Sequence, residues 1–286
     1  MKRRLLFGVA ATAGLSAMVP AYGQQQRIVS VGSALTEIVY ALGAEGRLVG
    51  VDTTSLYPEA ARSLPQVGYM RSLSAEGVLS LRPTLVIATT AAGPAETLAQ
   101  LKAAGIDVVV LSDHYDYESV IAKIEAVGNM TGKAEEARAM IERGRSEMAA
   151  LAAKLAGVTS KPRVLFLLSM GGGAPQAAGQ NTAADGIIRL AGGVNAVIGY
   201  NGYRPLTPEA VIASRADFVL VTRQTVEAMG GIEAILKQPA LAETPAAKTG
   251  RILQFDTLLL LGFGPRTPQA ATQLAAALHP ELAGAR

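Results

Sequence analysis

The chain carries one motif twice, as LSAEGVLSLRPTLVIAT at Leu73–Thr89 and as LTPEAVIASRADFVLVT at Leu206–Thr222. The two copies align without a gap, lie 133 residues apart and share six of 17 positions. Each copy places a short helix-like run before a run of aliphatic residues, which predicts a helix followed by a buried strand. The separation far exceeds the roughly 20 to 50 residues of a solenoid unit, so we expect two related lobes.

Short runs rich in β-branched residues alternate with helical segments on both sides of this repeat. Strands that alternate with helices are typical of a mostly parallel α/β sheet, as in Rossmann-like folds. We therefore predict one such sheet in each lobe. The expected strands begin at Arg27, Arg47, Thr84 and Asp107 in the first lobe and at Arg163, Asp217 and Arg251 in the second.

A different pattern separates the two halves. From Lys133 to Leu155, apolar residues recur every three or four positions among charged ones, which predicts one long amphipathic α-helix. At roughly 1.5 Å per residue this helix would be about 34 Å long, enough to join two lobes rigidly. We expect an N-terminal lobe over residues 24–130, the connecting helix over 131–158, a C-terminal lobe over 159–286, and a ligand cleft between the lobes.

The first residues predict export. The basic residues Lys2–Arg4 precede an apolar run that ends near Val19, and small residues follow up to Gly23. This order is typical of a cleavable secretory signal, and the run is too short for a stable membrane span. We expect a signal peptide over residues 1–23 and a soluble, exported product. The paired arginines leave both the Sec and the twin-arginine export routes open.

Composition excludes several classes of function. Without the signal segment the chain carries 23 basic and 23 acidic residues and no basic run, so it lacks the charge pattern of a nucleic-acid-binding protein. It has no cysteine, which rules out disulfides, thiolate nucleophiles, thiolate metal sites and a lipid anchor on cysteine. The sequence holds neither a phosphate-binding loop nor a nucleophile elbow.

The chain has two histidines, His114 and His279. Two are too few for the three-ligand cluster of a zinc or manganese carrier. His114 follows an expected strand and is predicted to lie in a plain loop or at the rim of the cleft. His279 stands near the C-terminus and is predicted to be solvated.

Several segments resemble the substrate-binding proteins of bacterial ABC importers whose two lobes are joined by one long helix. This group serves vitamin B12, ferric siderophores and haem. The segments with the general pattern are Arg27–Asp52, Leu79–Thr89 and Gly128–Ala137, and those most similar to the haem-binding branch are Gly68–Leu81, Gly179–Gly193 and Gly262–Pro268. The resemblance implies a periplasmic hemin-binding protein that is not an enzyme. It also implies that an outer-membrane haem receptor acts upstream and that a permease dimer in the inner membrane accepts the haem.

Tyr69 and Arg71 stand in the segment most typical of haem binding. The resemblance implies that Tyr69 ligates the haem iron and that Arg71 supports it. The chemistry agrees, because a phenolate oxygen is a hard donor suited to ferric iron and a nearby cation favours the ionised phenol. In an extended segment the two side chains would project to the same side, where Arg71 could hydrogen-bond the phenolate. The alternative is a packed tyrosine beside a solvated arginine.

Glu76 and Glu209 occupy the same position in the two copies of the repeat. Ser74 and Thr207 precede them by two residues and are predicted to cap the helices that follow. Helix capping and dipole stabilisation would explain both glutamates. The resemblance implies a further role, in which one glutamate from each lobe docks on arginines of the permease dimer.

The second lobe is expected to supply the opposite wall of the cleft. Arg204 matches Arg71 in the repeat and could hold a haem propionate, although a solvated loop arginine is the plainer interpretation. Tyr203 is a candidate to border the porphyrin. Met170, directly after an expected strand, is a candidate to approach the second face of the iron; both could instead be ordinary packing residues.

Two other functions fit parts of the pattern. The same scaffold could bind vitamin B12 or a ferric siderophore, since specificity resides in the loops. An exported small-molecule enzyme of the α/β type is the rival from another class. No convincing acid–base pair or nucleophile motif supports it.

Overall fold

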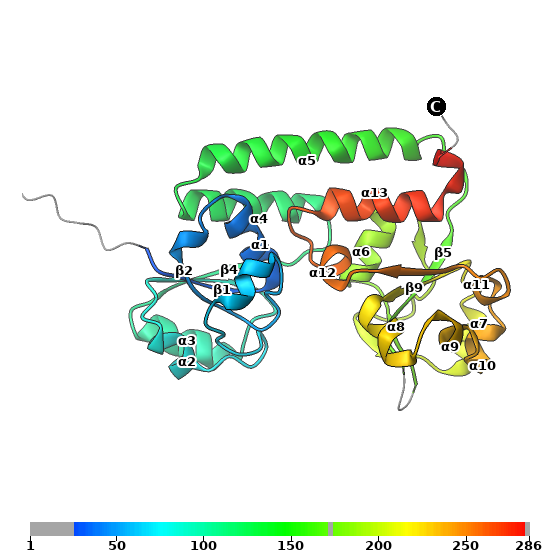
Figure 1. Cartoon of the computed structure of the whole chain (residues 1–286), viewed down its shortest axis with the longest axis horizontal. Coiled ribbons are helices and arrows are strands. Elements are labelled where there is room, and N and C mark those ends of the chain that lie inside the picture. The colour runs from blue at the N-terminus through cyan, green and yellow to red at the C-terminus, as the bar shows by residue number, and fades with distance from the viewer. Residues whose placement is uncertain (1–25, 171–173, 284–286) are drawn as a thin grey trace, which may run out of the picture.

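The computed structural model describes residues 26–170 and 174–283. It contains two α/β lobes that lie side by side, with the long helix α5 (Ala134–Leu155) along one side of both (Figure 1). The predicted signal peptide over residues 1–23 lies outside the described residues. Within the described part of the chain, no helix is both long and apolar enough to cross a membrane.

The first lobe is built on a four-stranded parallel sheet with the order β2-β1-β3-β4. Side chains alternate along β1, so that Ile28 packs with α1 and α4, whereas Val29 and Val31 pack with α2 and α3. The four strands predicted for this lobe are confirmed. The elements are β1 (Ile28–Val31), α1 (Ser33–Ala41), η1 (Glu45–Arg47), β2 (Leu48–Val51), η2 (Glu59–Ser63), α2 (Ala75–Ser80), β3 (Leu85–Thr89), α3 (Ala95–Ala103), β4 (Asp107–Leu111) and α4 (Tyr117–Met130).

The second lobe is built on a mixed sheet with the order β10-β9-β5-β6-β8, and β7 pairs with β5. The three predicted strands are parallel to one another, and the unpredicted β7 is parallel to β5. The strands β6 and β8 are antiparallel and were not predicted either. Each of these two has only three residues, too few to show a period. The elements are β5 (Arg163–Ser169), β6 (Gln176–Ala178), α6 (Ala183–Leu190), β7 (Val194–Asn195), β8 (Tyr203–Pro205), α7 (Pro208–Ala213), β9 (Phe218–Thr222), α8 (Arg223–Met229), α9 (Ile232–Leu236), α10 (Pro239–Ala242), α11 (Pro245–Lys248), β10 (Ile252–Phe255), α12 (Thr257–Leu261), α13 (Thr267–Leu278) and η3 (Pro280–Ala283).

The sequence repeat is also a structural repeat. The pair α2 and β3 in the first lobe matches α7 and β9 in the second. The hydroxyls of Ser74 and Thr207 accept hydrogen bonds from the backbone N–H three residues on, at 3.2 and 3.3 Å, so both predicted N-caps are confirmed. Arg82 and Arg215, again in matching positions, both have a φ of 46° after these helices.

The amphipathic helix predicted over residues 133–155 is confirmed by α5, which begins one residue later and lies within the connecting range of 131–158. It packs on α4 and α13, and a Cβ added to Gly144 would collide with the Tyr117 hydroxyl of α4. One apolar core runs from α1 and α4 of the first lobe through α5 to α6 and α13 of the second. A core that continues across the connection restricts the lobes to small relative motions.

His279 is buried, so the prediction that it is solvated is wrong. It follows directly on α13 and is 0% exposed. The Leu282 N–H donates to the His279 carbonyl at 3.0 Å, and η3 folds back on the end of α13. This packing is a tertiary contact of the tail, for which the local sequence has no signal.

Candidate ligand-binding site between the lobes

Tyr69 lies on a loop that hydrogen bonds fix at the carboxyl end of the first sheet. The Gly68 carbonyl accepts from the Thr53 N–H at 3.0 Å, and the Met70 carbonyl accepts from the Gly93 N–H at 2.9 Å. These bonds tie the loop to the segments that follow β2 and β3. The Tyr69 side chain is 46% exposed, so a fixed backbone presents an accessible phenol.

Residues 69–72 form a turn, so the extended geometry under which Tyr69 and Arg71 would project to one side is not present. The Ser72 N–H donates to the Tyr69 carbonyl at 2.8 Å, which reverses the chain within four residues. Side chains alternate regularly only along an extended chain, so the spacing of two does not bring Arg71 beside Tyr69. Among the described residues, no hydrogen bond joins the Tyr69 hydroxyl to Arg71.

The positive charge of Arg71 acts on two tyrosines that belong to different lobes, Tyr115 and Tyr203. Tyr115 follows β4 in the first lobe, and Tyr203 begins β8 in the second. Burial raises the pKa of both tyrosines, to about 12 for Tyr203, and the positive charge of Arg71 partly opposes the rise at each. Tyr203 therefore stays neutral at physiological pH and can donate a hydrogen bond. Arg71 and Tyr203 are predicted site residues, whereas Tyr115 carries no local signal beyond its place after a strand.

Tyr203 and Arg204 point to opposite faces of the second sheet, because they are neighbours in strand β8 and not in the predicted loop. Tyr203 lies edge-on to Phe166, with the ring centroids 6.3 Å apart. Arg204 is exposed, and its guanidinium lies 5.3 Å from the centroid of the Tyr200 ring. Of the two, Tyr203 is the one whose pKa the charge of Arg71 influences.

Met170 and His114 each line a cavity within a single lobe. Met170 is half-buried against the apolar cluster with which Tyr200 packs, and it lines a cavity of about 380 Å³ within the second lobe. His114 is exposed in the loop after β4 and lines a cavity of about 300 Å³ within the first lobe. Five cavities in the described part of the chain each lie within one lobe. None of these five cavities therefore contains the expected cleft between the lobes.

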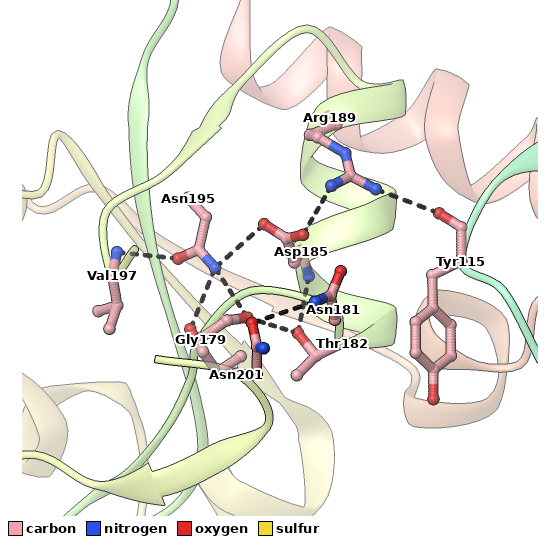
Figure 2. A network of polar contacts seen from close by, with 10 residues as sticks. Tyr115, Gly179, Asn181, Thr182, Asp185, Arg189, Asn195, Val197 and Asn201 are labelled. Atoms are coloured by element: carbon pink, nitrogen blue, oxygen red, sulfur yellow. Dashed lines mark hydrogen bonds and ion pairs between the residues drawn. The ribbon is translucent and has the colours of Figure 1, made fainter. Parts of the chain in front are cut away.

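A buried polar network positions the strand that pairs with Tyr203 (Figure 2). Asn195 donates to the carbonyl oxygens of Ala178 and Gly179, both at 3.1 Å, and to the Asp185 carboxylate at 3.3 Å. Ala178 is the partner of Tyr203 in the ladder between β6 and β8. The network therefore fixes the wall of the second lobe, and no sequence pattern predicts it.

The same network reaches the first lobe. Arg189 on α6 donates to the Asp185 carboxylate at 2.8 Å and to the Tyr115 carbonyl at 3.5 Å (Figure 2). Tyr115 also packs edge-on against Phe263, with the ring centroids 5.4 Å apart. A Cβ on Gly186 would collide with Tyr115, so glycine permits this close approach. Tyr115 is thus held by residues of the second lobe.

A second contact between the lobes joins α1 to the start of α13. Arg266 donates two hydrogen bonds of 2.9 Å to the Glu37 carboxylate, which is only 10% exposed. The Arg266 guanidinium also lies 3.5 Å from the centroid of the Tyr57 ring. Burial alone would lower the pKa of Arg266, but the hydrogen bond and charge of Glu37 raise it above the ordinary value. The segment Gly262–Pro268 contains Arg266, whereas no local signal points to Glu37.

Glu76 and Glu209 are exposed on α2 and α7, at the ends of the two lobes that face away from α5 (Figure 1). Both stand in the first turn of a capped helix. The backbone N–H of Glu209 and the Thr207 side chain hold the pKa of Glu209 below its ordinary value, as expected at a helix N-terminus. The position of both residues and the lowered pKa of Glu209 agree with the capping role, and docking stays a prediction.

Solved structures with this fold include periplasmic haem-binding proteins. BhuT in complex with two haems is 43% identical, with a TM-score of 0.85, and the match covers 90% of this chain and 99% of that chain. RhuT from Roseiflexus sp. RS-1, in its apo form, is 43% identical with a TM-score of 0.84 and the same coverage. A periplasmic haem-binding protein from Pseudomonas aeruginosa is 40% identical with a TM-score of 0.81, covering 89% of this chain and 93% of that chain.

Two curated relatives have lower identity. A vitamin B12-binding protein of Vibrio vulnificus is 29% identical over 87% of this chain and 88% of its own length. An uncharacterised ABC transporter substrate-binding lipoprotein of Bacillus subtilis is 28% identical over 90% of this chain and 81% of its own length. The family model described as "periplasmic binding protein" matches residues 28–257. Because this match spans most of the chain and both lobes, the chain belongs to the periplasmic binding protein family.

Proposed function

We propose that this protein binds haem between its two lobes in the periplasm and delivers it to the permease of an ABC importer. The observation that carries the proposal is the exposed Tyr69 on a loop that backbone hydrogen bonds fix at the carboxyl end of the first sheet. The haem-binding relatives, at 40 to 43% identity over 89 to 90% of the chain, support it.

Tyr69 is the proposed axial ligand of the haem iron. Tyrosine is one of the axial ligands that proteins use for haem, and its phenolate oxygen suits ferric iron. Because the phenol loses its proton when it binds the metal, the affinity for ferric haem should rise with pH. Arg71 is the proposed hydrogen-bond donor to the bound phenolate.

The second lobe supplies the proposed opposite wall. Tyr203 has the stronger support, because it shares the electrostatic influence of Arg71 and stays neutral when buried. Arg204 faces the other side of β8, but β8 is the edge strand of its sheet, so a haem propionate could reach Arg204 around that edge. Met170 stays the proposed residue near the second face of the iron, and its packing inside the second lobe makes it the weakest assignment.

Delivery of haem requires a permease partner. It does not require catalysis by this chain. Glu76 and Glu209 are the proposed contacts with arginines of the permease dimer, one from each lobe. The exposed positions of these residues at corresponding ends of the two lobes support a two-point attachment. The proposal includes export through a signal peptide over residues 1–23 and a supply of haem from an outer-membrane receptor.

Vitamin B12 is the alternative ligand, favoured by the Vibrio vulnificus relative at 29% identity. Hemin and cyanocobalamin can be distinguished by titrating each into the chain from residue 24 onward and following the absorption spectrum. Saturable binding of hemin, with weak or no binding of cyanocobalamin, is the expected result. Tight binding of cyanocobalamin with no hemin complex would overturn the proposed ligand.

A further inference from the structure

The loop after β2, residues 52–58, is rigidly built and contacts the loop that carries Tyr69. The Asp52 side chain is 0% exposed and organises the loop from within. The Thr53 N–H donates to the carbonyl of Gly68, the residue before Tyr69, at 3.0 Å. Asp52 accepts hydrogen bonds of 2.5 to 2.9 Å from the Gly32 N–H, the Thr54 N–H and hydroxyl, and the Ser55 hydroxyl.

Tyr57 is presented by this loop at the boundary of the two lobes. Its side chain is 42% exposed, close to the 46% of Tyr69 on the adjacent loop. One face of the Tyr57 ring carries the guanidinium of Arg266, 3.5 Å from the ring centroid. Because Arg266 comes from the second lobe, the ring lies between the lobes with part of its surface free.

The Arg266 guanidinium is itself held in place. Its two hydrogen bonds to Glu37 fix the plane of the guanidinium, since a bidentate pair with a carboxylate constrains both position and orientation. The plane of the Tyr57 ring is therefore constrained before any ligand binds. Glu37 also neutralises the positive charge, so an apolar ligand beside the ring would not meet an uncompensated cation.

We propose that Tyr57 is a stacking residue for the porphyrin, with its ring held by the ion pair between Arg266 and Glu37. The inference rests on the proposed haem site and adds a wall residue to it. A flat macrocycle gains most from an aromatic ring whose orientation is already fixed, because little side-chain entropy is lost on binding. The contact that joins the lobes thus also shapes one wall of the site.

Hemin titrations of Tyr57→Ala and Tyr57→Phe test the proposal. The alanine variant should bind hemin about tenfold more weakly, because the stacking surface is lost, and the phenylalanine variant should stay within about twofold of the wild type. The phenolate-to-iron charge-transfer band should be unchanged in both, because Tyr69 still ligates the iron. Ile198→Ala, a change at a 68% exposed side chain of the second lobe, serves as the control and should leave the affinity unchanged.

A double variant separates stacking from simple packing between the lobes. Arg266→Gln should weaken hemin binding about threefold by freeing the ring, and adding it to Tyr57→Ala should cause no further loss, because Arg266 acts through Tyr57. Losses that multiply, or a Tyr57→Ala affinity equal to that of the wild type, would overturn the inference while leaving the haem site intact. A wild-type protein that binds no hemin would overturn the proposed function as well.

Discussion

Glu37 and Arg266 stand 229 positions apart in the chain and are joined by two hydrogen bonds of 2.9 Å between the lobes. The side chains are 10% and 23% exposed, so water screens the pair only weakly. The pair borders the core that α1, α5 and α13 share. It is therefore a fixed part of the connection between the lobes, and removing one partner leaves the other charge largely buried.

Glu37→Gln should lower the free energy of unfolding by about 2 kcal/mol, because Arg266 then lacks a countercharge. Urea denaturation of the ligand-free protein measures this change. The double variant Glu37→Gln with Arg266→Gln is the matched control and should recover part of the loss, since no charge is left unpaired. A single variant within about 0.5 kcal/mol of the wild type would contradict the structural role of the pair.

Tyr203 should make the protein sensitive to alkali. Burial raises its pKa from 10.0 to about 12, so the folded state holds the phenol proton more tightly than the unfolded state. The stabilisation from this group is complete below about pH 10 and is lost as the pH rises through about 12. Tyr203→Phe should therefore lose less stability than the wild type between these values, by up to about 2 kcal/mol. Urea denaturation at stepped pH gives the comparison, and parallel profiles would rule out the effect.

Asn195 should stabilise the folded second lobe. Asn195→Ala removes the side-chain donor to the Ala178 carbonyl and the acceptor of the Val197 N–H, and leaves the Gly179 carbonyl with the Thr182 hydroxyl alone as side-chain donor. We expect a loss of about 2 to 3 kcal/mol in the free energy of unfolding. In this variant, hydrogen exchange of the β6 and β8 amides should accelerate more than exchange of the amides in the first lobe. Uniform exchange across both lobes would be inconsistent with a local role.

Replacing Glu76 and Glu209 together with alanine separates docking from capping. The double variant should bind hemin like the wild type but lose most haem delivery to permease-containing vesicles, because both attachment points are removed. The control replaces the caps Ser74 and Thr207 with alanine, which should cost about 1 kcal/mol per helix and leave delivery intact. Wild-type delivery by the glutamate variant would exclude the docking role.

Local sequence patterns were sufficient to predict the main strands, the connecting helix and the two lobes. The seven predicted strands and the helix α5 follow from runs of residues whose period is visible in one segment, and the repeat at Leu73–Thr89 and Leu206–Thr222 indicated two lobes. The strands β6, β7 and β8 have two or three residues each and are fixed by pairing and by Asn195, which no local pattern reveals.

The candidate site was predictable by residue type but not by geometry. Tyr69 lies on an accessible loop, whereas residues 69–72 form a turn that the spacing of Tyr69 and Arg71 does not reveal. Arg204 was predicted in a loop but lies in strand β8, where backbone pairing decides which way its side chain points. Contacts such as Tyr57 with Arg266 depend on how the lobes pack, so they required the structure.

The absorption spectrum of hemin bound to the wild type and to Tyr69→Phe tests the central claim most directly. The wild type should show a phenolate-to-iron charge-transfer band and saturable binding. The variant should lose the band and bind hemin at least about tenfold more weakly, because phenylalanine offers no oxygen to the iron. A variant that keeps both the band and the wild-type affinity would show that Tyr69 is not the ligand.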